Sequence, residues 1–190
     1  GVAMHDALTL WTIGHSNRPI TELIAMLTQA TIATLVDVRA QPHSARHPQF
    51  NEESLRESCG QANIVYHWAG RHLGGKRALR FDSPHIALDE GRRGFADHMG
   101  TEIFKKALSQ FVSLATRAPT AMLCAERDPD HCHRALIADY LTLQGMRIVH
   151  LIGPGEHRDH LLSPQARRES AALIYDRQVT AELDLGKPSG

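Results

Sequence analysis

Residues 8–38 read LTLWTIGHSNRPITELIAMLTQATIATLVDV and contain the repeating unit that decides the fold. The apolar run Leu8–Ile13 predicts a strand. Residues 20–29 place apolar side chains at helical spacing, with Thr21 as the expected N-cap, and the β-branched run Thr34–Val38 predicts a second, buried strand. A strand, a helix and a strand in this order indicate a parallel βαβ unit.

The same alternation continues along the chain. Strands are expected at Ile64–Trp68, Thr120–Cys124 and Arg147–Ile152, and helices at Asn51–Gln61, Phe95–Thr116 and Cys132–Gln144. The glycine-rich and proline-rich segment 70–94 predicts a long functional loop with a short helix, and a further short helix is expected at 163–175. The sequence therefore predicts an α/β, Rossmann-like three-layer sandwich with a mostly parallel, doubly wound five-stranded sheet.

Length and composition favour one domain in a reducing compartment. The 190 residues fit a single α/β domain over residues 4–176, with 177–190 as a polar C-terminal tail. The 21 basic and 21 acidic side chains balance, which argues against a strong overall field for nucleic acid. Three cysteines do not form a disulfide framework. Since no apolar run is long enough to span a membrane and no signal pattern opens the chain, we expect a cytoplasmic protein without membrane contact.

Polar side chains follow three of the predicted strands where each strand ends. His15 and Ser16 follow the first strand, Asp37 and Arg39 end the second, and Glu126 follows the fourth. Ligands of doubly wound sheets bind outside the carboxyl ends of the strands, so these groups are expected at one rim. Buried charges need partners, and the alternative interpretation is a structural cluster in which Asp37 pairs with Arg39 and Glu126 pairs with Arg134.

The segment Cys132-His133-Arg134 lies where the last predicted helix begins. A helix start favours an anion and lowers the pKa of a nearby thiol, so Cys132 is expected to be more reactive than Cys59. Cys132 or Cys124 is the candidate nucleophile, and His133 and Arg134 are candidate substrate-binding residues. The alternative for Cys132 is a small buried hydrophobic residue.

Other motifs in the chain are less specific. Gly74 and Gly75, flanked by basic residues, could approach a phosphate closely or form a plain turn. The patterns G-x-G-x-x-G and G-x-x-x-x-G-K-[ST] are missing, and so is G-x-S-x-G, which argues against dinucleotide, P-loop and serine hydrolase sites. Cysteine and histidine residues within 124–133 invite a zinc interpretation, but paired ligand spacings are missing, so no metal ligand is assigned.

A set of short motifs, in this order, resembles the uncharacterised domain-of-unknown-function family 488 (DUF488). The motifs span roughly residues 9–152 and are Thr12-Ile13-Gly14-His15-Ser16, Asp37-Val38-Arg39, Pro42 with Ser44, Pro48 with Phe50, Tyr66, Leu73-Gly74-Gly75, Phe95 with Met99, Leu123-Cys124-Ala125-Glu126 and Cys132-His133-Arg134. The resemblance implies the α/β fold and the rim, adds Ser44 and Tyr66 to the candidate substrate-binding residues, and leaves the substrate open. His98 stands where an aromatic residue such as Tyr is expected, which concerns only packing.

These observations favour an enzyme, a hydrolase or transferase, that acts on a small anionic substrate such as a nucleotide, nucleoside or modified base. His15, Asp37, Glu126 and Cys132 are the candidate catalytic residues. Ser16, Arg39, Ser44, Tyr66, Gly74, Gly75, His133 and Arg134 are the candidate substrate-binding residues. Two alternatives stay open: a non-catalytic nucleotide or nucleic-acid binding module that uses Arg71, Lys76, Arg77 and Arg80, and a zinc protein. The sequence assigns no cofactor and no oligomeric state.

Overall fold

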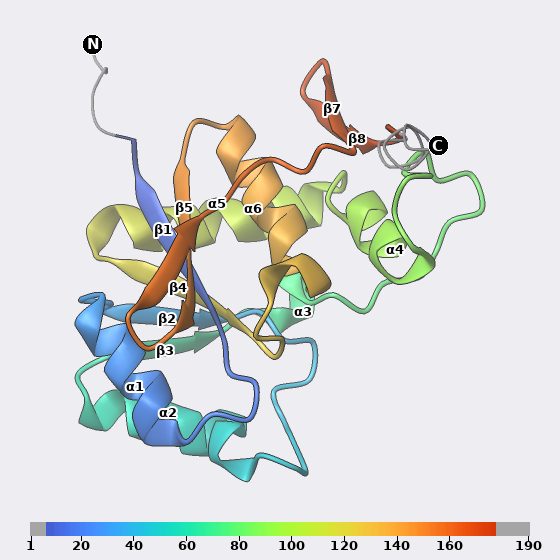
Figure 1. The fold of residues 1–190 in the computed structure, drawn as a ribbon. Helices are drawn as coiled ribbons and strands as arrows, with labels where there is room; N and C mark the ends of the chain where they lie inside the picture. Colours follow the sequence, from blue (N-terminus) through green and yellow to red (C-terminus); the bar gives the residue numbers. More distant parts are fainter. Residues whose placement is uncertain (1–6, 178–190) are drawn as a thin grey trace, which may run out of the picture.

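A six-stranded sheet in the order β3-β2-β4-β1-β5-β6 forms the centre of the molecule in the computed structural model, which describes residues 7–177 (Figure 1). Strands β1 to β5 run parallel and β6 pairs antiparallel with β5. Their bounds are Thr9–Gly14 for β1, Thr34–Asp37 for β2, Val65–Trp68 for β3, Thr120–Cys124 for β4, Arg147–Gly153 for β5 and Glu156–Asp159 for β6. The predicted mixed α/β class with a mostly parallel sheet is confirmed.

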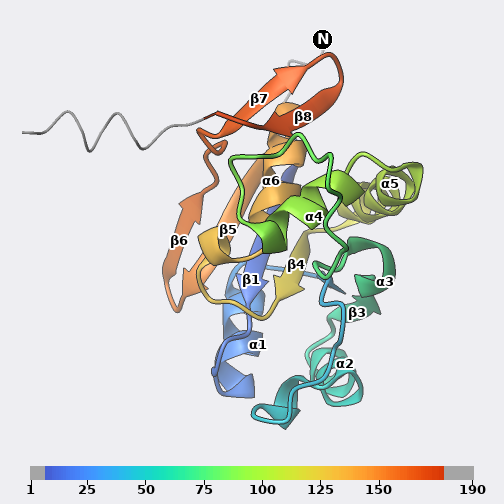
Figure 2. The same cartoon turned by 90° about the vertical axis from the view of Figure 1, so that its right-hand side faces the viewer.

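Helices cover both faces of this sheet (Figures 1 and 2). One face packs against α1 (Ile20–Gln29) and α2 (Glu52–Gln61), and the other against α5 (Glu102–Arg117), α6 (Arg134–Leu143) and the shorter α3 (Gly70–Leu73) and α4 (Glu90–His98). Neighbouring strand residues point to opposite faces: Leu123 belongs to the α1/α2 core, and Met122 and Cys124 belong to the α5/α6 core. This alternation produces the three layers.

The connections reverse direction between β1 and β4. The chain leaves β1 through α1 toward β2 and leaves β4 through α6 toward β5 on the other side. A crevice opens where neighbouring strands send their connections in opposite directions. His15 and Cys124 lie at this crevice because the end of β1 pairs with the end of β4, with the N–H of His15 donating to the Cys124 carbonyl at 2.9 Å.

The sheet has one strand more than the five expected. All four residues of β6 are exposed, and their sequence is Glu156-His157-Arg158-Asp159. An edge strand of this kind carries no apolar alternation, so the periodicity that reveals buried strands is missing.

The single helix expected over 95–116 is wrong. Its residues belong to two helices, α4 and α5, because local caps start each one: Asp89 accepts from the N–H of Arg92 at 2.9 Å and Thr101 accepts from the N–H of Phe104 at 3.2 Å. The expected apolar stripe of α5 holds at Phe104, Leu108 and Phe111, which are buried, while Leu114 is half-buried.

The helix expected at 163–175 is also wrong, since residues 166–175 form a β-hairpin. Its strands β7 (Ala166–Glu169) and β8 (Ala172–Tyr175) pair antiparallel around Ser170, which has a φ of 55°. The carbonyl of Tyr175 accepts from the N–H of Ala87, which ties the hairpin to the loop before α4.

Two helix starts also differ from the prediction. Pro19, not Thr21, precedes the first turn of α1. Helix α6 begins at Arg134 rather than at Cys132, because residues 129–131 form a separate 3-10 turn, η2, capped by Asp128. Another 3-10 turn, η1, covers Pro48–Phe50.

Within residues 7–177 no helix is long and apolar enough to cross a membrane. The expected tail falls, apart from Arg177, outside the described residues.

Candidate active site at the carboxyl ends of β1, β2 and β4

A cavity of about 410 Å³ lies at the crevice between β1 and β4. Its walls come from the loops after β1, β2, β3 and β4 and from the first turn of α4. The lining includes His15, Arg39, His43, Ser44, Gly75, Lys76, Arg92, Cys124, Glu126, His131, Cys132 and His133. We call this cavity the rim pocket. Its volume falls in the range of small-molecule sites.

Asp37 and Arg39 form a buried ion pair behind one wall of the rim pocket. Asp37 is fully buried, and its carboxylate accepts from Nε of Arg39 at 2.9 Å and from Nη2 at 2.7 Å. The hydroxyl of Tyr66 also donates to Asp37, and burial raises the pKa of Tyr66 above its usual value, so the phenol keeps its proton. The predicted pairing of Asp37 with Arg39 is confirmed, and Asp37 and Tyr66 lie behind the pocket lining.

Arg39 retains one hydrogen-bonding group to offer. The residue is 6% exposed and lines the rim pocket, yet its Nη1 has no hydrogen-bond partner among residues 7–177. A buried unpaired N–H group of a guanidinium is costly. Within the described part of the chain, the Nη1 group is therefore the one donor group of this guanidinium that is left for a further acceptor.

His15 is held as a neutral base. Its Nδ1 lies 2.9 Å from the carbonyl of Ser16, which can only accept, so Nδ1 carries the proton and Nε2 the lone pair. The ring stacks on Phe50 with centroids 4.6 Å apart, and burial lowers the pKa of His15 to about 4. His15 therefore presents an uncharged nitrogen base to the pocket at neutral pH.

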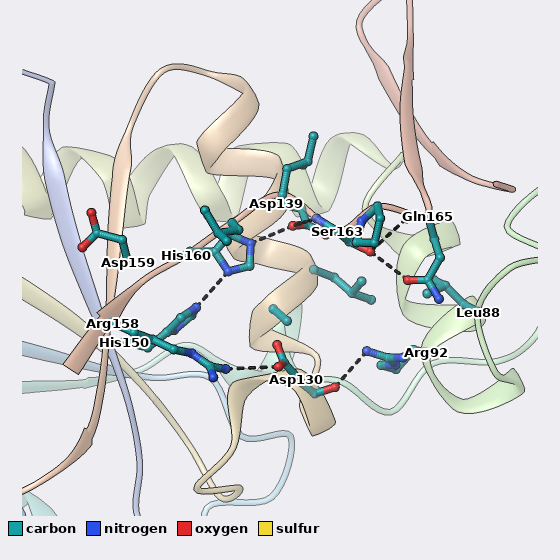
Figure 3. Close-up of a pocket in the computed structure, with 15 residues that line it drawn as sticks. Leu88, Arg92, Asp130, Asp139, His150, Arg158, Asp159, His160, Ser163 and Gln165 are labelled. Atoms are coloured by element: carbon teal, nitrogen blue, oxygen red, sulfur yellow. Dashed lines mark hydrogen bonds and ion pairs between the residues drawn. The ribbon is translucent and has the colours of Figure 1, made fainter. Parts of the chain in front are cut away.

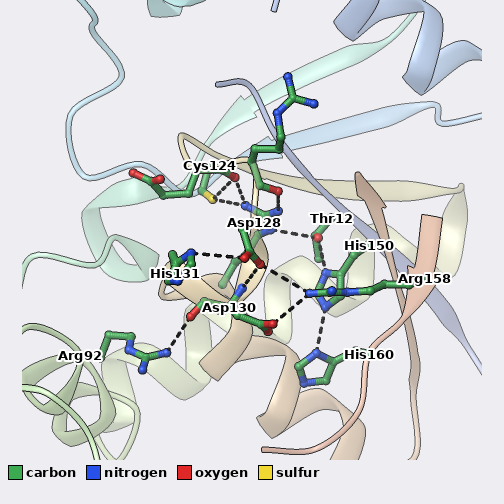
Figure 4. A network of polar contacts seen from close by, with 12 residues as sticks. Thr12, Arg92, Cys124, Asp128, Asp130, His131, His150, Arg158 and His160 are labelled. Carbon is green, nitrogen blue, oxygen red and sulfur yellow. Dashed lines mark hydrogen bonds and ion pairs between the residues drawn. The ribbon is translucent and has the colours of Figure 1, made fainter. Parts of the chain in front are cut away.

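Arg134 is completely buried beneath the rim pocket and does not line it. Its guanidinium donates to Oγ1 of Thr12 at 3.0 Å, to the sulfur of Cys124 and to the carbonyls of Glu126 and Arg127; the contacts of Cys124 and Thr12 can be followed in Figure 4. The predicted pairing of Arg134 with the carboxylate of Glu126 is wrong. The guanidinium donates to the backbone carbonyl of Glu126, and the side chain of Glu126 is exposed.

Cys124 and Cys132 form a pair on the floor of the rim pocket, 1% and 6% exposed. Burial alone would raise the pKa of Cys124, but a hydrogen bond from Cys132 and the charge of Arg134 outweigh it and lower that pKa to about 7. The same hydrogen bond, together with burial, raises the pKa of Cys132 well above its usual value. The expected lowering at Cys132 is therefore wrong: Cys124 is the thiol that loses its proton readily, because the guanidinium donates to its sulfur.

His133 connects the thiols to the glycine pair. Its Nε2 lies 3.0 Å from the carbonyl of Leu73, so Nδ1 is the accepting nitrogen and lies 3.7 Å from the sulfur of Cys132. Burial lowers the pKa of His133 to about 4. A Cβ at Gly75 would lie 2.8 Å from this ring, so glycine is required for the loop to approach His133.

The remaining predicted residues differ in their distance from the cavity. Glu126 and Ser44 line it, and the carboxylate of Glu126 is exposed. Gly74 and Ser16 stand outside the lining; a Cβ at Gly74 would lie 2.4 Å from the carbonyl of Gly70, which gives this glycine a packing role.

The sequence interpretation missed His43, Arg92 and His131 in the lining. Arg92 lies in the first turn of α4, which was expected to be loop, and it also donates to the carbonyl of Asp130 at 3.2 Å. An N-cap residue, Asp89, followed by the acidic first-turn residue Glu90 could have located that helix start.

A second cavity, of about 490 Å³, lies between α6, β5 and β6 (Figure 3). His150 and His160 line it and belong to a buried chain of hydrogen bonds: Thr12 Oγ1 to His150 Nδ1 at 2.6 Å, His150 Nε2 to His160 Nδ1 at 2.8 Å, and His160 Nε2 to Asp139 at 2.7 Å. Since Arg134 donates to Thr12 and Asp139 accepts, a neutral His150 lets the hydrogen bonds run in one direction from Thr12 to Asp139. The polar groups of this hydrogen-bonded chain form their hydrogen bonds with one another and leave none for a ligand, so the rim pocket is the better candidate site.

The geometry can be compared with the two alternative functions. Among the described residues, no group of three or more His, Cys, Asp and Glu side chains is placed to hold a metal ion. Of the basic residues proposed for nucleic acid, Arg77 donates to the carbonyls of Gly74 and Arg71, and Arg80 pairs with Asp82. Lys76 lines the rim pocket.

Comparison with known proteins gives one match. A family model described as "Domain of unknown function DUF488" matches residues 19–141. This confirms the resemblance that the sequence motifs indicated. No curated protein and no solved structure matches the chain.

Proposed function

The chain belongs to the DUF488 family, and we propose that it is an enzyme that binds a small anionic substrate, such as a nucleotide, in the rim pocket and carries out group transfer or hydrolysis there. The observation that carries this proposal is the unpaired Nη1 of buried Arg39 at a pocket with three cationic side chains, Arg39, Lys76 and Arg92, and one carboxylate, Glu126.

Anion binding follows from this charge distribution. Asp37 holds Arg39 bidentately, so the guanidinium is fixed in place before a substrate arrives. A preformed donor loses little conformational entropy on binding. Lys76 is exposed at the pocket and would supply a second, mobile cation.

Chemistry in the pocket rests on three groups. Cys124 is the nucleophile, because the buried guanidinium of Arg134 favours its thiolate form. His15 offers a neutral Nε2 as a proton acceptor, and Glu126 offers an exposed carboxylate. Cys132, expected to be the nucleophile from the sequence, is assigned to a supporting role.

The substrate class is tested by ligand-induced stabilisation. Unfolding temperatures are measured with nucleoside monophosphates, diphosphates and triphosphates and with inorganic phosphate, for the unmodified protein, Lys76→Ala and the matched control Lys106→Ala. Lys106 is exposed on α5 and does not line the rim pocket. We expect a nucleotide to raise the unfolding temperature of the unmodified protein and of the control, and to act more weakly on Lys76→Ala.

Turnover is tested with the ligands that bind. Mass spectrometry of the small molecules detects a lost base, a lost phosphate or a transferred group, and Cys124→Ser is expected to abolish that change. A protein that no nucleotide stabilises would contradict the substrate class. Binding that is equal in all three proteins and weakens steeply with salt would favour nucleic-acid recognition outside the pocket.

A further inference from the structure

Two thiols and one buried cation meet on the floor of the rim pocket. The guanidinium of Arg134 donates to the sulfur of Cys124, and the backbone N–H of the same residue donates to the sulfur of Cys132 at 3.4 Å. Both sulfurs line the cavity. One residue therefore fixes the position of both thiols.

The charge of Arg134 needs a counter-ion. The residue is completely buried, and its guanidinium contacts Thr12 Oγ1, two carbonyl oxygens and the sulfur of Cys124, with no carboxylate among these partners. Cys124 is the only one of these partners that can become an anion. Since an unpaired buried charge costs several kcal/mol, the thiolate form of Cys124 is favoured by the packing itself.

Cys132 has the complementary position. The backbone N–H of Arg134 donates to its sulfur at 3.4 Å, the accepting Nδ1 of His133 lies 3.7 Å from it, and its raised pKa keeps the thiol protonated. Once Cys124 has reacted, the charge of Arg134 favours a thiolate at Cys132, and Nδ1 of His133 lies where it can relay the thiol proton to water.

We propose that Cys124 and Cys132 act as attacking and resolving thiols, and that the rim pocket reduces a small anionic substrate that contains a sulfur–sulfur bond. The inference rests on the same pocket as the proposed function. The pocket adds a reason for the anionic class, since Arg39 lines its wall and has a buried Nη1 without a hydrogen-bond partner among residues 7–177.

The reaction balances in two steps. The thiolate of Cys124 attacks one sulfur of the substrate, a bond forms between them, and the other half of the substrate leaves with the electron pair of the broken sulfur–sulfur bond. Cys132 then loses its proton to water, relayed by Nδ1 of His133, and attacks the sulfur of Cys124, which expels the second half as a thiolate. The substrate gains two electrons, the protein gains one disulfide, and a dithiol reductant must return that disulfide to two thiols.

Tetrathionate is a suitable probe, because it is a small dianion with a central sulfur–sulfur bond. The fully reduced protein is treated with it under native conditions, and the intact mass, the disulfide-linked peptides and the released thiosulfate are measured. We expect the loss of two hydrogens, a link between Cys124 and Cys132, and two thiosulfate ions released for each protein molecule.

Serine variants separate the two roles. Cys132→Ser is expected to keep one thiosulfate group on Cys124 and to release one ion, and Cys124→Ser is expected to lose the rapid reaction. Cys59→Ser is the matched control, because Cys59 is fully buried in the other core, and it should behave like the unmodified protein. Lys76→Ala should slow the reaction with tetrathionate several-fold and leave the reaction with the neutral disulfide of mercaptoethanol unchanged.

The unmodified protein alone can refute the inference, so the test does not depend on the folding of a serine variant. A stable thiosulfate adduct on this protein, or a reaction through Cys59, would refute it. The rate of disulfide formation with each reagent is divided by the rate at which free cysteine reacts with that reagent. If this ratio is the same for tetrathionate and for the neutral disulfide, the preference for an anionic substrate is refuted. Nucleotide binding without disulfide formation leaves the proposed function standing and removes only the dithiol reaction. Disulfide formation without nucleotide binding supports the dithiol reaction and contradicts a nucleotide as the substrate of the proposed function.

Discussion

Acidification from pH 7 to pH 5 should remove a large part of the stability of this protein. Burial lowers the pKa of His15 and of His133 to about 4 and the pKa of His150 to about 3; His15 and His150 are buried, and His133 is half-buried at the rim pocket. The unfolded chain binds protons on these imidazoles near pH 6.5. Because the folded pKa values are the lower ones, the stability is complete above pH 6.5 and is lost as the pH falls toward 4.

The magnitude follows from these pKa values. One pKa unit corresponds to about 1.4 kcal/mol, so at pH 5 each neutral imidazole would cost the folded state about 2 kcal/mol relative to the unfolded chain. The three residues together should lower the free energy of unfolding by about 5 kcal/mol between pH 7 and pH 5, which is comparable to the whole stability of many domains.

Urea unfolding at pH 5, 6, 7 and 8 measures how steeply the free energy of unfolding changes with pH, which we call the pH slope. His150→Gln should reduce the pH slope by about one third, and His67→Gln, at an exposed position on β3, should leave it unchanged. His150 also keeps its proton on Nε2 because Nε2 donates to His160, so protonation at Nδ1 would break the bond from Thr12. A free energy of unfolding that changes by less than about 1 kcal/mol between pH 7 and pH 5 would refute the neutral-imidazole reasoning.

Three substitutions test individual contacts of the candidate site. Arg39→Met leaves the carboxylate of Asp37 buried without its ion pair, and urea unfolding should show a loss of about 3–5 kcal/mol; an unchanged midpoint would contradict a structural role for the pair. Gly14→Ala places a Cβ 1.7 Å from the carbonyl of Glu126, so more than about 3 kcal/mol should be lost, measured the same way, and a stable variant would show that the loop after β4 can move. Glu126→Gln changes an exposed side chain, so the unfolding midpoint should stay within about 0.5 kcal/mol while ligand binding, followed by calorimetry, changes.

The sequence predicted those elements whose burial follows a simple period. Strand β4 at Thr120–Cys124 and helix α1 at Ile20–Gln29 have the predicted bounds, because β4 is buried along its whole length between the two cores and the buried residues of α1 face one core. Strand β6 and the hairpin of β7 and β8 could not be found in this way. Their residues are largely exposed, and their strand structure depends on pairing with a partner strand rather than on local apolar alternation.

The same division applies to the candidate site. The polar residues after β1, β2 and β4 could be assigned to one rim from the sequence, because parallel strands place their carboxyl ends at the same edge. Which of them reach the cavity could not be assigned, since Asp37 and Arg134 lie behind the wall and Arg92 enters from α4.

The sequence by itself determined the alternation of strands and helices through the five parallel strands, the rim and the family, because these depend on local periodicity and on motifs that are contiguous in the chain. Only the tertiary structure decided which thiol carries the charge. The pKa of Cys124 is lowered because Arg134, ten residues later, folds back onto its sulfur, while the neighbouring Cys124 and burial raise the pKa of Cys132, adjacent to the same helix start. Charge at a buried group depends on its three-dimensional neighbours and on its distance from water, and neither of these can be read from spacing along the chain.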